Sequence, residues 1–366
     1  MNDAKEHNNY ASSGVNYAQL DPAKRSAQEL VRATMARKLF TGAKPLHSFV
    51  GESAGVIKLP GNAGWIAQVE EGLGTLIQMC DWLYKNCNEA TWYARAARGT
   101  VAMIVNDMIT SGILPVSVMM HLAVGDSKWV ADKERMLHLN RGWAEACVES
   151  GAAWVGGETP CLVDIVNPDT AVLAGSATGW LDHQSKPYRQ QIRVGDRIIG
   201  VASSGLHCNG ITFFRKIAEA QSSDVTAQMY RDGLTPTMLY SRLIRRLRML
   251  GLTPSYVSGI TGHGIRKVMR AEKELTYCIT NTLPTQPIFD QFARLGNVTP
   301  RNMWGDYNMG TGIVLFVRPD IAKRVIQCAK KTGYTALDMG SVEKGPRRVI
   351  VKPYDLEFCG DELGVR

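Results

Sequence analysis

Residues 101–112 read VAMIVNDMITSG, and the first nine are apolar around nearly the whole circumference of a helix. This pattern predicts a buried helix. Asn106 and Asp107 interrupt it, and a carboxylate in apolar surroundings is costly unless a cation or hydrogen-bond donors compensate it. Two interpretations stay open: Asp107 caps a neighbouring loop, or it takes part in binding a metal ion or a metal–phosphate group.

Helix and strand patterns alternate on both sides of this helix, and they predict an α/β or α+β fold with mixed sheets covered by helices. We expect two domains, residues 1–183 and 184–366, joined by the polar, proline-bearing stretch 182–188. The helices are expected from Asp21 to Gly42, at about 91–111 and 128–150, and from Ile211, Thr235, Gly264 and Pro319. The strands are expected at 65–69, 116–122, 171–181, 197–202, 275–280, 312–317, 336–342 and 347–352.

Length and composition are typical of a globular protein. The chain has 366 residues, of which 45% are hydrophobic and 21% are charged. A chain of this size buries about three quarters of its unfolded surface, so it needs no disulfide or metal to fold. The formal net charge of +8 favours anionic partners such as phosphorylated small molecules. The densest basic runs fall on amphipathic helices without interleaved aromatic residues, so a nucleic-acid partner is not expected.

The eight cysteines form no C-x-x-C pair and no close cluster with histidine, and several lie in apolar stretches. Residues 1–9 are polar and no run of 18 apolar residues occurs, so neither a secretory signal nor a membrane span is expected. These features predict a cytoplasmic protein.

Glycine pairs stand at five predicted strand-to-helix junctions, where backbone amides can approach an anion closely. Ordinary tight turns are the alternative for any one of them. Glu70, Glu71 and Glu158 lie beside two of these loops and could join Asp107 around Mg²⁺, which prefers such oxygen ligands next to nucleotide phosphates. No P-loop motif and no G-x-G-x-x-G after a strand occurs. The glycine pairs are 72/74, 156/157, 205/210, 262/264 and 310/312.

His207 lies in the predicted strand–loop–helix junction SSGLHCNG at residues 203–210. A histidine there could donate to a phosphate or shuttle a proton near neutral pH. Packing within the loop is the other interpretation, and it is the commoner one for an isolated histidine.

At these loops the chain resembles the aminoimidazole ribonucleotide synthetase (phosphoribosylformylglycinamidine cyclo-ligase) family. The motifs occur in the family's order along nearly the whole chain, and their common order makes the resemblance specific. They are YASSGVN at 10–16, EEGLGTL at 70–76, VNDM at 105–108 followed by Gly112 and Pro115, SG at 150–151 with VGGET at 155–159, SSGLHCNG at 203–210, TGHG at 261–264 and NMGTG at 308–312.

The resemblance implies an enzyme with the two-domain fold of that family, dimeric through its N-terminal domains, that uses ATP and Mg²⁺. It also implies the reaction, which closes formylglycinamidine ribonucleotide to aminoimidazole ribonucleotide with release of ADP and phosphate in purine biosynthesis. The implied site residues are His207, Asn209 and Asp107 for catalysis, Asp107 and Glu71 for the metal, Glu71, Gly72, Gly74, Thr75, Asn106, Gly156, Gly157 and Glu158 for the nucleotide, and Thr261, Gly262, Gly264, Gly310 and Gly312 for the substrate phosphate.

Three departures from the family motifs concern this site. The aspartate of T-D-G-V-G-T-K is Glu71 here, its lysine is Leu76, and the middle glycine of T-G-G-G is His263. The lost lysine removes one positive partner of a phosphate, which Arg95, Arg98 or Lys58 would have to replace.

Two further functions stay open. The chain could be a relative with the same fold and another phosphoryl acceptor, such as selenophosphate synthetase, thiamine-phosphate kinase or a hydrogenase maturation protein. It could also be a catalytically degenerate nucleotide-binding protein. ADP release that depends on formylglycinamidine ribonucleotide separates the cyclo-ligase from both.

Overall fold

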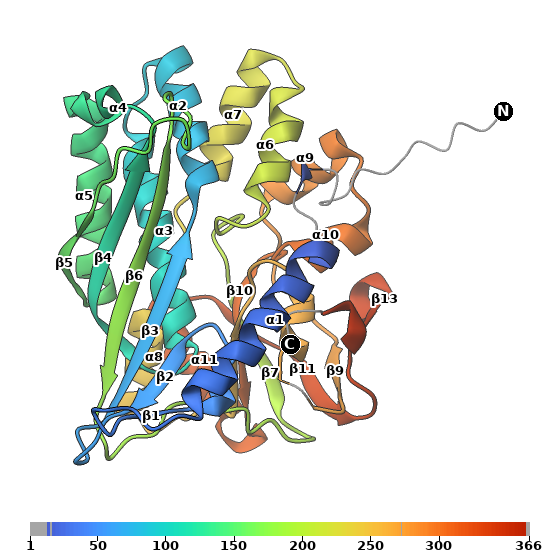
Figure 1. The fold of residues 1–366 in the computed structure, drawn as a ribbon. Helices are drawn as coiled ribbons and strands as arrows, with labels where there is room; N and C mark the ends of the chain where they lie inside the picture. The colour runs from blue at the N-terminus through green and yellow to red at the C-terminus, as the bar shows by residue number, and fades with distance from the viewer. Residues whose placement is uncertain (1–12, 15–16, 272, 364–366) are drawn as a thin grey trace.

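The chain folds around two mixed β-sheets, one from each half of the sequence (Figure 1). The computed structural model describes residues 13–14, 17–271 and 273–363. In these ranges, one sheet takes its strands from residues 44–181 and the other from residues 197–359. The predicted fold class is therefore confirmed. The domain boundary between residues 183 and 184 falls in the connection between the two sheets and stays a prediction.

The first sheet has the strand order β1-β2-β3-β6-β4-β5, in which β4 and β5 run parallel and the other neighbours antiparallel. Helices α2 and α3 pack on one face, and α5 packs against α3. The other face exposes side chains such as Met119, Val172 and Trp180. The elements of this half are α1 (Tyr17–Met35), β1 (Lys44–Pro45), η2 (His47–Phe49), β2 (Gly55–Lys58), β3 (Trp65–Gly72), α2 (Gly74–Cys87), α3 (Trp92–Ile109), β4 (Leu114–Val124), α4 (Ser127–Ala131), α5 (Lys133–Ser150), β5 (Ala153–Glu158) and β6 (Ala171–Leu181).

The second sheet has the order β13-β12-β9-β11-β7-β10-β8. Its strand β10 reads TGIVLFV and is buried along its whole length, because helices and loops cover both faces. The elements are β7 (Arg197–Ala202), α6 (Ile211–Glu219), α7 (Ser223–Gly233), α8 (Ser241–Met249), β8 (Tyr256–Gly259), η3 (Gly264–Met269), β9 (Leu275–Ile279), α9 (Pro287–Gly296), α10 (Pro300–Asp306), β10 (Thr311–Val317), α11 (Pro319–Lys331), β11 (Ala336–Lys344), β12 (Arg348–Val351), η4 (Lys352–Tyr354), β13 (Leu356–Cys359) and η5 (Gly360–Glu362).

The prediction of a buried helix around Asp107 is confirmed. All residues of α3 from Gly99 to Ile109 are buried, and the chain leaves the helix at Gly112, which has a φ of 72°. The strands predicted at 171–181 and 197–202 also match β6 and β7.

Several predicted boundaries are wrong. The first helix spans Tyr17–Met35 and ends before the predicted Gly42. The helix predicted at 128–150 is broken at Asp132, whose side chain accepts a hydrogen bond from the backbone N–H of Arg135 and so caps the start of α5. The sequence patterns did not predict α2, which follows directly after the strand β3.

Two predicted helices of the second half begin differently. The helix expected from Thr235 begins only at Ser241, because residues 236–240 are held in an extended connection by side chains described below. The helix expected after Gly264 is the short 3₁₀ segment η3.

The N-terminal motif at residues 10–16 lies mostly outside the described residues. Among the helices that the structure does describe, none is both long and apolar enough to cross a bilayer.

Candidate active site

A cavity of about 470 Å³ collects charged side chains from five separate segments of the chain. It lies where α1 passes the junction between the two halves (Figure 1). The residues that line it are Lys24, Ala27, Gln28, Gly51, Glu52, Glu71, Asp107, Asn209, Thr261, Gly262, His263, Lys267 and Arg270. We call it the carboxylate cavity.

Strand periodicity explains why Glu71, and not Glu70, enters this cavity. Successive residues of β3 point to opposite faces of the sheet, so Glu71 shares the helix-covered face with the buried Val69. Glu70 points to the exposed face. Asp107 lies in the last turn of α3, which packs on the same covered face. The two carboxyl groups predicted to hold a metal therefore meet, although 35 residues of sequence separate them.

Glu71 and Asp107 interact directly. The pKa of Glu71 is raised to about 8, first by burial and then by the charge of Asp107 and a side-chain hydrogen bond with it. At neutral pH, Glu71 therefore holds a proton, which removes the repulsion between two charged carboxylates. Within the described residues no cluster of three or more His, Cys, Asp or Glu side chains could hold a metal alone. Mg²⁺ needs only one or two carboxylates when phosphate oxygens complete its ligands, so the pair fits Mg²⁺ bound together with a phosphate.

Two cations share the cavity with this pair: Lys267 in η3 and Arg270 directly after it. Lys267 Nζ donates to Thr261 Oγ1, and burial, followed by the charge of Arg270, lowers the pKa of Lys267 to about 8. Arg270 donates to the backbone oxygen of Gly51 at 3.0 and 2.6 Å and to Ser53 Oγ at 2.7 Å. It therefore fixes the loop before β2 against the second half of the chain.

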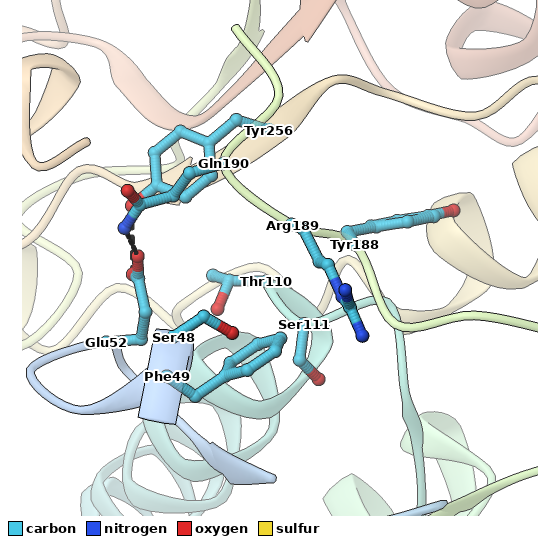
Figure 2. A pocket seen from close by; sticks show the side chains of 9 residues that line it. All are labelled: Ser48, Phe49, Glu52, Thr110, Ser111, Tyr188, Arg189, Gln190 and Tyr256. Atoms are coloured by element: carbon cyan, nitrogen blue, oxygen red, sulfur yellow. Dashed lines mark hydrogen bonds between the residues drawn. The ribbon is translucent and has the colours of Figure 1, made fainter. Parts of the chain in front are cut away.

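Glu52 lines both the carboxylate cavity and a second, small pocket, which Figure 2 shows. Its side chain accepts hydrogen bonds from Gln190 Nε2 and from Tyr256 Oη (2.9 Å), and it lies 3.7 Å from Arg270 Nε. The pocket holds only about 20 Å³, which is too little for a substrate. Glu52 therefore serves to position Arg270 and the connection at residues 188–190.

A second cavity, of about 440 Å³, opens between the first turns of α2 and α6. Gly72, Gly74 and Thr75 line one side, and Ile211 and Thr212 line the other. Neither helix carries an acidic residue in its first turn. Free backbone amides and the positive ends of two helices favour an anion here. We call it the helix-end cavity.

Asn209 lines both cavities. Its Oδ1 accepts a hydrogen bond from the backbone N–H of Gly262 at 2.9 Å, and its Nδ2 donates to the backbone oxygen of His207 at 2.6 Å. Asn209 thus joins the 203–210 loop to the T-G-x-G loop and lines both cavities, and its catalytic role stays a prediction.

Asn106 has a different role from the predicted one. Its Nδ2 donates to the backbone oxygen of Met238 at 2.7 Å, and its Oδ1 accepts from the backbone N–H of Tyr240 at 3.1 Å. These two bonds, with Ser204 Oγ donating to the oxygen of Pro236 at 2.6 Å, hold residues 236–240 extended. Asn106 lines neither cavity and braces α3 against the second half of the chain.

The structure also corrects the role predicted for His207. The imidazole is buried, lines neither cavity, and accepts hydrogen bonds at Nε2 from the backbone N–H groups of Ser204 (2.9 Å) and Met238 (3.4 Å). Burial lowers the pKa of His207 to about 3. A neutral, enclosed imidazole of this kind packs the loop and does not fit a proton shuttle near neutral pH.

We expect His207→Ala to lower the free energy of unfolding by ~2 kcal/mol at pH 7.5, because it leaves a buried backbone donor without its acceptor. The folded-state pKa lies below the unfolded value of 6.5, so this stabilisation is complete above pH 6.5 and is lost as the pH falls towards 3. Urea unfolding at pH 7.5 and pH 5 should therefore show a smaller difference between the two proteins at the lower pH. An equal difference at both pH values would contradict the buried neutral state.

Three glycines predicted to bind the substrate phosphate are buried and serve packing instead. A Cβ at Gly264 would lie 2.4 Å from the oxygen of Trp304, and one at Gly310 would lie 2.4 Å from the oxygen of Pro284. A Cβ at Gly312 would lie 1.9 Å from Tyr240 Oη. Of the predicted phosphate residues, only Thr261 and Gly262 line the carboxylate cavity.

Gly156, Gly157 and Glu158 are not at a strand-to-helix junction. They belong to β5, the edge strand of the first sheet, where they pair with residues 119–121 of β4. All three are exposed and line neither cavity. A nucleotide-binding role for them is therefore not supported within one chain.

The three cations suggested as replacements for the lost lysine are engaged elsewhere. Arg98 forms an ion pair with Glu149 (2.6 Å), and Arg95 and Lys58 lie over the rings of Trp92 and Trp65. Sequence reasoning missed the cations that do enter the cavity, Lys24, Lys267 and Arg270. The signal that could have found the last two is the basic run at residues 266–270, directly after the T-G-x-G motif.

Comparison with known proteins identifies the family of the chain. The chain is 31% identical over 297 residues to the phosphoribosylformylglycinamidine cyclo-ligase of Carboxydothermus hydrogenoformans, covering 77% of this chain and 81% of that protein. The chain belongs to the phosphoribosylformylglycinamidine cyclo-ligase family, a family of enzymes. The enzyme of the same name from Clostridium perfringens is 27% identical over 356 residues, which cover 94% of this chain and 99% of that one. A family model described as AIR synthase related protein, N-terminal domain, matches residues 51–181.

Solved structures share the fold at low identity. T. maritima PurL, solved as a complex with FGAR, has a TM-score of 0.59 and 16% identity over 87% of this chain and 49% of that one. AaThiL, solved as a complex with AMPPCP and TMP, has a TM-score of 0.56 and 13% identity over 90% of this chain and 94% of that one.

Proposed function

We propose that this protein closes the imidazole ring of aminoimidazole ribonucleotide in purine biosynthesis. The substrates are formylglycinamidine ribonucleotide and ATP, and the products include ADP and phosphate. The family supports the reaction class. One observation carries the proposal: Glu71 and Asp107 interact in the carboxylate cavity, and Asn209 lines both this cavity and the helix-end cavity.

The chemistry needs little covalent work from the protein. The amide oxygen of the substrate is a poor leaving group, so ATP transfers its terminal phosphoryl group to that oxygen and leaves as ADP. The neighbouring amine nitrogen then attacks the carbon of this iminophosphate, loses a proton, and phosphate departs with the oxygen. The catalyst must mainly position the phosphates and compensate their charge.

The described residues can divide this work between the cavities. The amides at the starts of α2 and α6, including Gly74 and Thr75, would hold nucleotide phosphates in the helix-end cavity. Glu71 and Asp107 would hold Mg²⁺, which supplies positive charge at phosphate oxygens when bound. Asn209 would orient the group that passes between the cavities.

A coupled assay tests the proposal. The purified protein is incubated with MgATP, with and without formylglycinamidine ribonucleotide, and ADP, phosphate and aminoimidazole ribonucleotide are quantified. We expect one aminoimidazole ribonucleotide per ADP and negligible ADP without the substrate. ADP release that another acceptor stimulates, or ATP binding without turnover, would replace the cyclo-ligase by one of the two other functions considered above.

We further propose that two copies pair through the open face of the first sheet. Met119, Trp180 and Val155 are 47%, 48% and 58% exposed on this face and its edge, and among the described residues no strand pairs with the outer side of β5. Unprotected edges and apolar faces of this kind are normally covered. A second copy there would also cover Gly156 and Gly157.

Sedimentation velocity tests this pairing. The wild type is expected to sediment as a dimer and Met119→Glu as a monomer, because a charge would be buried in the interface. Lys323→Glu, on the exposed side of α11, is the control that should remain dimeric. A monomeric wild type would contradict the pairing.

Finally, we infer that the protein acts in the cytoplasm. All eight cysteines lie in the described ranges and carry free thiols, and four of them are not fully buried: Cys87, Cys161, Cys208 and Cys359. Free thiols persist in a reducing compartment.

A further inference from the structure

The carboxylate cavity is not purely acidic, although the predicted metal ligands lie in it. Lys24, Lys267 and Arg270 stand in the same cavity as Glu52, Glu71 and Asp107. Three cations therefore match three carboxylates. A cavity built only for a metal ion would have no use for the cations, whereas a cavity for a metal ion together with an anion needs both kinds of charge.

Lys24 is exposed, and of the two less exposed cations, Lys267 has more hydrogen-bonding capacity left than Arg270. An ammonium group has three N–H donors, and the described residues provide Lys267 Nζ with one hydrogen-bond acceptor, Thr261 Oγ1. Arg270 already donates to Gly51 and Ser53. The neighbouring Arg266 lies outside the cavity and is held by Gly305, Asp306 and Glu362.

The place of Lys267 is fixed from both sides. Thr261 holds its ammonium group, and the charges of Asp107 and Glu71 act on it directly. Ser258 Oγ donates to the backbone oxygen of Lys267 at 3.0 Å, which ties η3 to β8. The cation is thus held next to the carboxyl pair by the fold and does not reach it as a flexible surface side chain.

The family motif at residues 70–76 ends in a lysine, but Leu76 occupies that position here and is buried in the core. We propose that Lys267 replaces that lysine and binds a phosphate group of the nucleotide or of the ribonucleotide substrate in the carboxylate cavity. The assignment rests on the proposed function for the identity of the ligand. The binding itself requires only a phosphate-bearing molecule, so it can be tested without turnover.

Binding measurements test the proposal with three probes: MgATP, MgADP and ribose 5-phosphate. Isothermal titration of Lys267→Met is expected to show a Kd raised by ~10-fold or more for at least one probe, since hydrogen bonds to charged groups are among the strong ones. A loss for MgATP but not MgADP assigns Lys267 to the terminal phosphate. A loss for ribose 5-phosphate assigns it to the substrate. Lys323→Met, exposed on α11, is the matched control and should bind all probes as the wild type does.

A second measurement uses the wild type and so does not depend on the variant's folding. Acetic anhydride acetylates accessible amines, and mass spectrometry gives the rate at each lysine. A probe that contacts Lys267 should slow its acetylation about tenfold at a concentration near ten times Kd, by mass action, and leave Lys323 unchanged. Absence of protection by all three probes, or unchanged Kd values in Lys267→Met, would overturn the proposal. Neither result depends on the ring-closure assay. Failure of the Lys267 proposal can therefore be distinguished from failure of the proposed function.

Discussion

Asp107→Asn is expected to lower the kcat of ring closure by ~10³-fold, which is the scale for removing one preorganised electrostatic contact with the reacting group. The amide is almost the same size as the carboxylate, so packing in the last turn of α3 is preserved. What is lost is the negative charge that, with Glu71, would hold Mg²⁺. The measurement is steady-state release of ADP and aminoimidazole ribonucleotide at saturating MgATP.

The same variant should change how stability depends on pH. The folded-state pKa of Glu71, about 8, lies above its usual value of 4.5, so the folded protein binds the extra proton between these pH values. Its stabilising contribution is complete below pH 4.5 and is lost as the pH rises through 8. Because the charge of Asp107 is one cause of the raised pKa, Asp107→Asn should lose less stability than the wild type between pH 5 and pH 9.

Asp290→Asn, which removes an exposed carboxylate from α9, is the matched control and should retain wild-type turnover. Near-wild-type activity in Asp107→Asn with an unchanged fold would remove Asp107 from the site. It would also separate the buried pair from the chemistry, leaving it as a packing feature of α3.

Local sequence patterns predicted helices and strands well where apolar residues recur with a regular period. The helix around Asp107 and the strands β6 and β7 follow from runs of apolar residues whose period is unambiguous. The start of α8 could not be predicted this way. Thr235-Pro236 is a good local helix start, but hydrogen bonds from Asn106, in the other half of the chain, keep Met238 and Tyr240 out of the helix. The sequence around residue 235 contains no sign of this distant contact.

The same reason limits the prediction of the site. Glu71 and Asp107 could be paired because Asp107 interrupts an apolar helix, Glu71 lies beside a glycine loop, and the resemblance assigns both segments to one site. Lys267 could not, because its contact with the pair depends on how η3 of the second half meets α3 of the first. The glycine motifs, by contrast, predicted ligand contacts that the cavities do not include. Glycine is required at Gly264 and Gly310 because neighbouring backbone atoms leave no room for a Cβ.

Gly312→Ala distinguishes these two reasons for a glycine, and we expect it to lower the free energy of unfolding by ~3 kcal/mol through overpacking. The added methyl group would lie 1.9 Å from Tyr240 Oη and 2.9 Å from His207 Cε1. Tyr240 cannot simply move aside, because its hydroxyl donates to the backbone oxygen of Ala202 at 2.7 Å and its ring packs against Tyr334. Urea unfolding at pH 7.5 measures the loss.

The control is Gly55→Ala in β2, where the nearest atom to an added Cβ is the oxygen of Gln68 at 3.9 Å, an ordinary contact. That variant should unfold at nearly the wild-type urea concentration. If Gly312 contacted the substrate phosphate instead, Gly312→Ala would raise KM while leaving the unfolding transition in place. A loss of stability with an unchanged KM in the remaining folded protein would therefore assign a packing role to the NMGTG motif. The motif would then hold β10 against Tyr240 and the 203–210 loop.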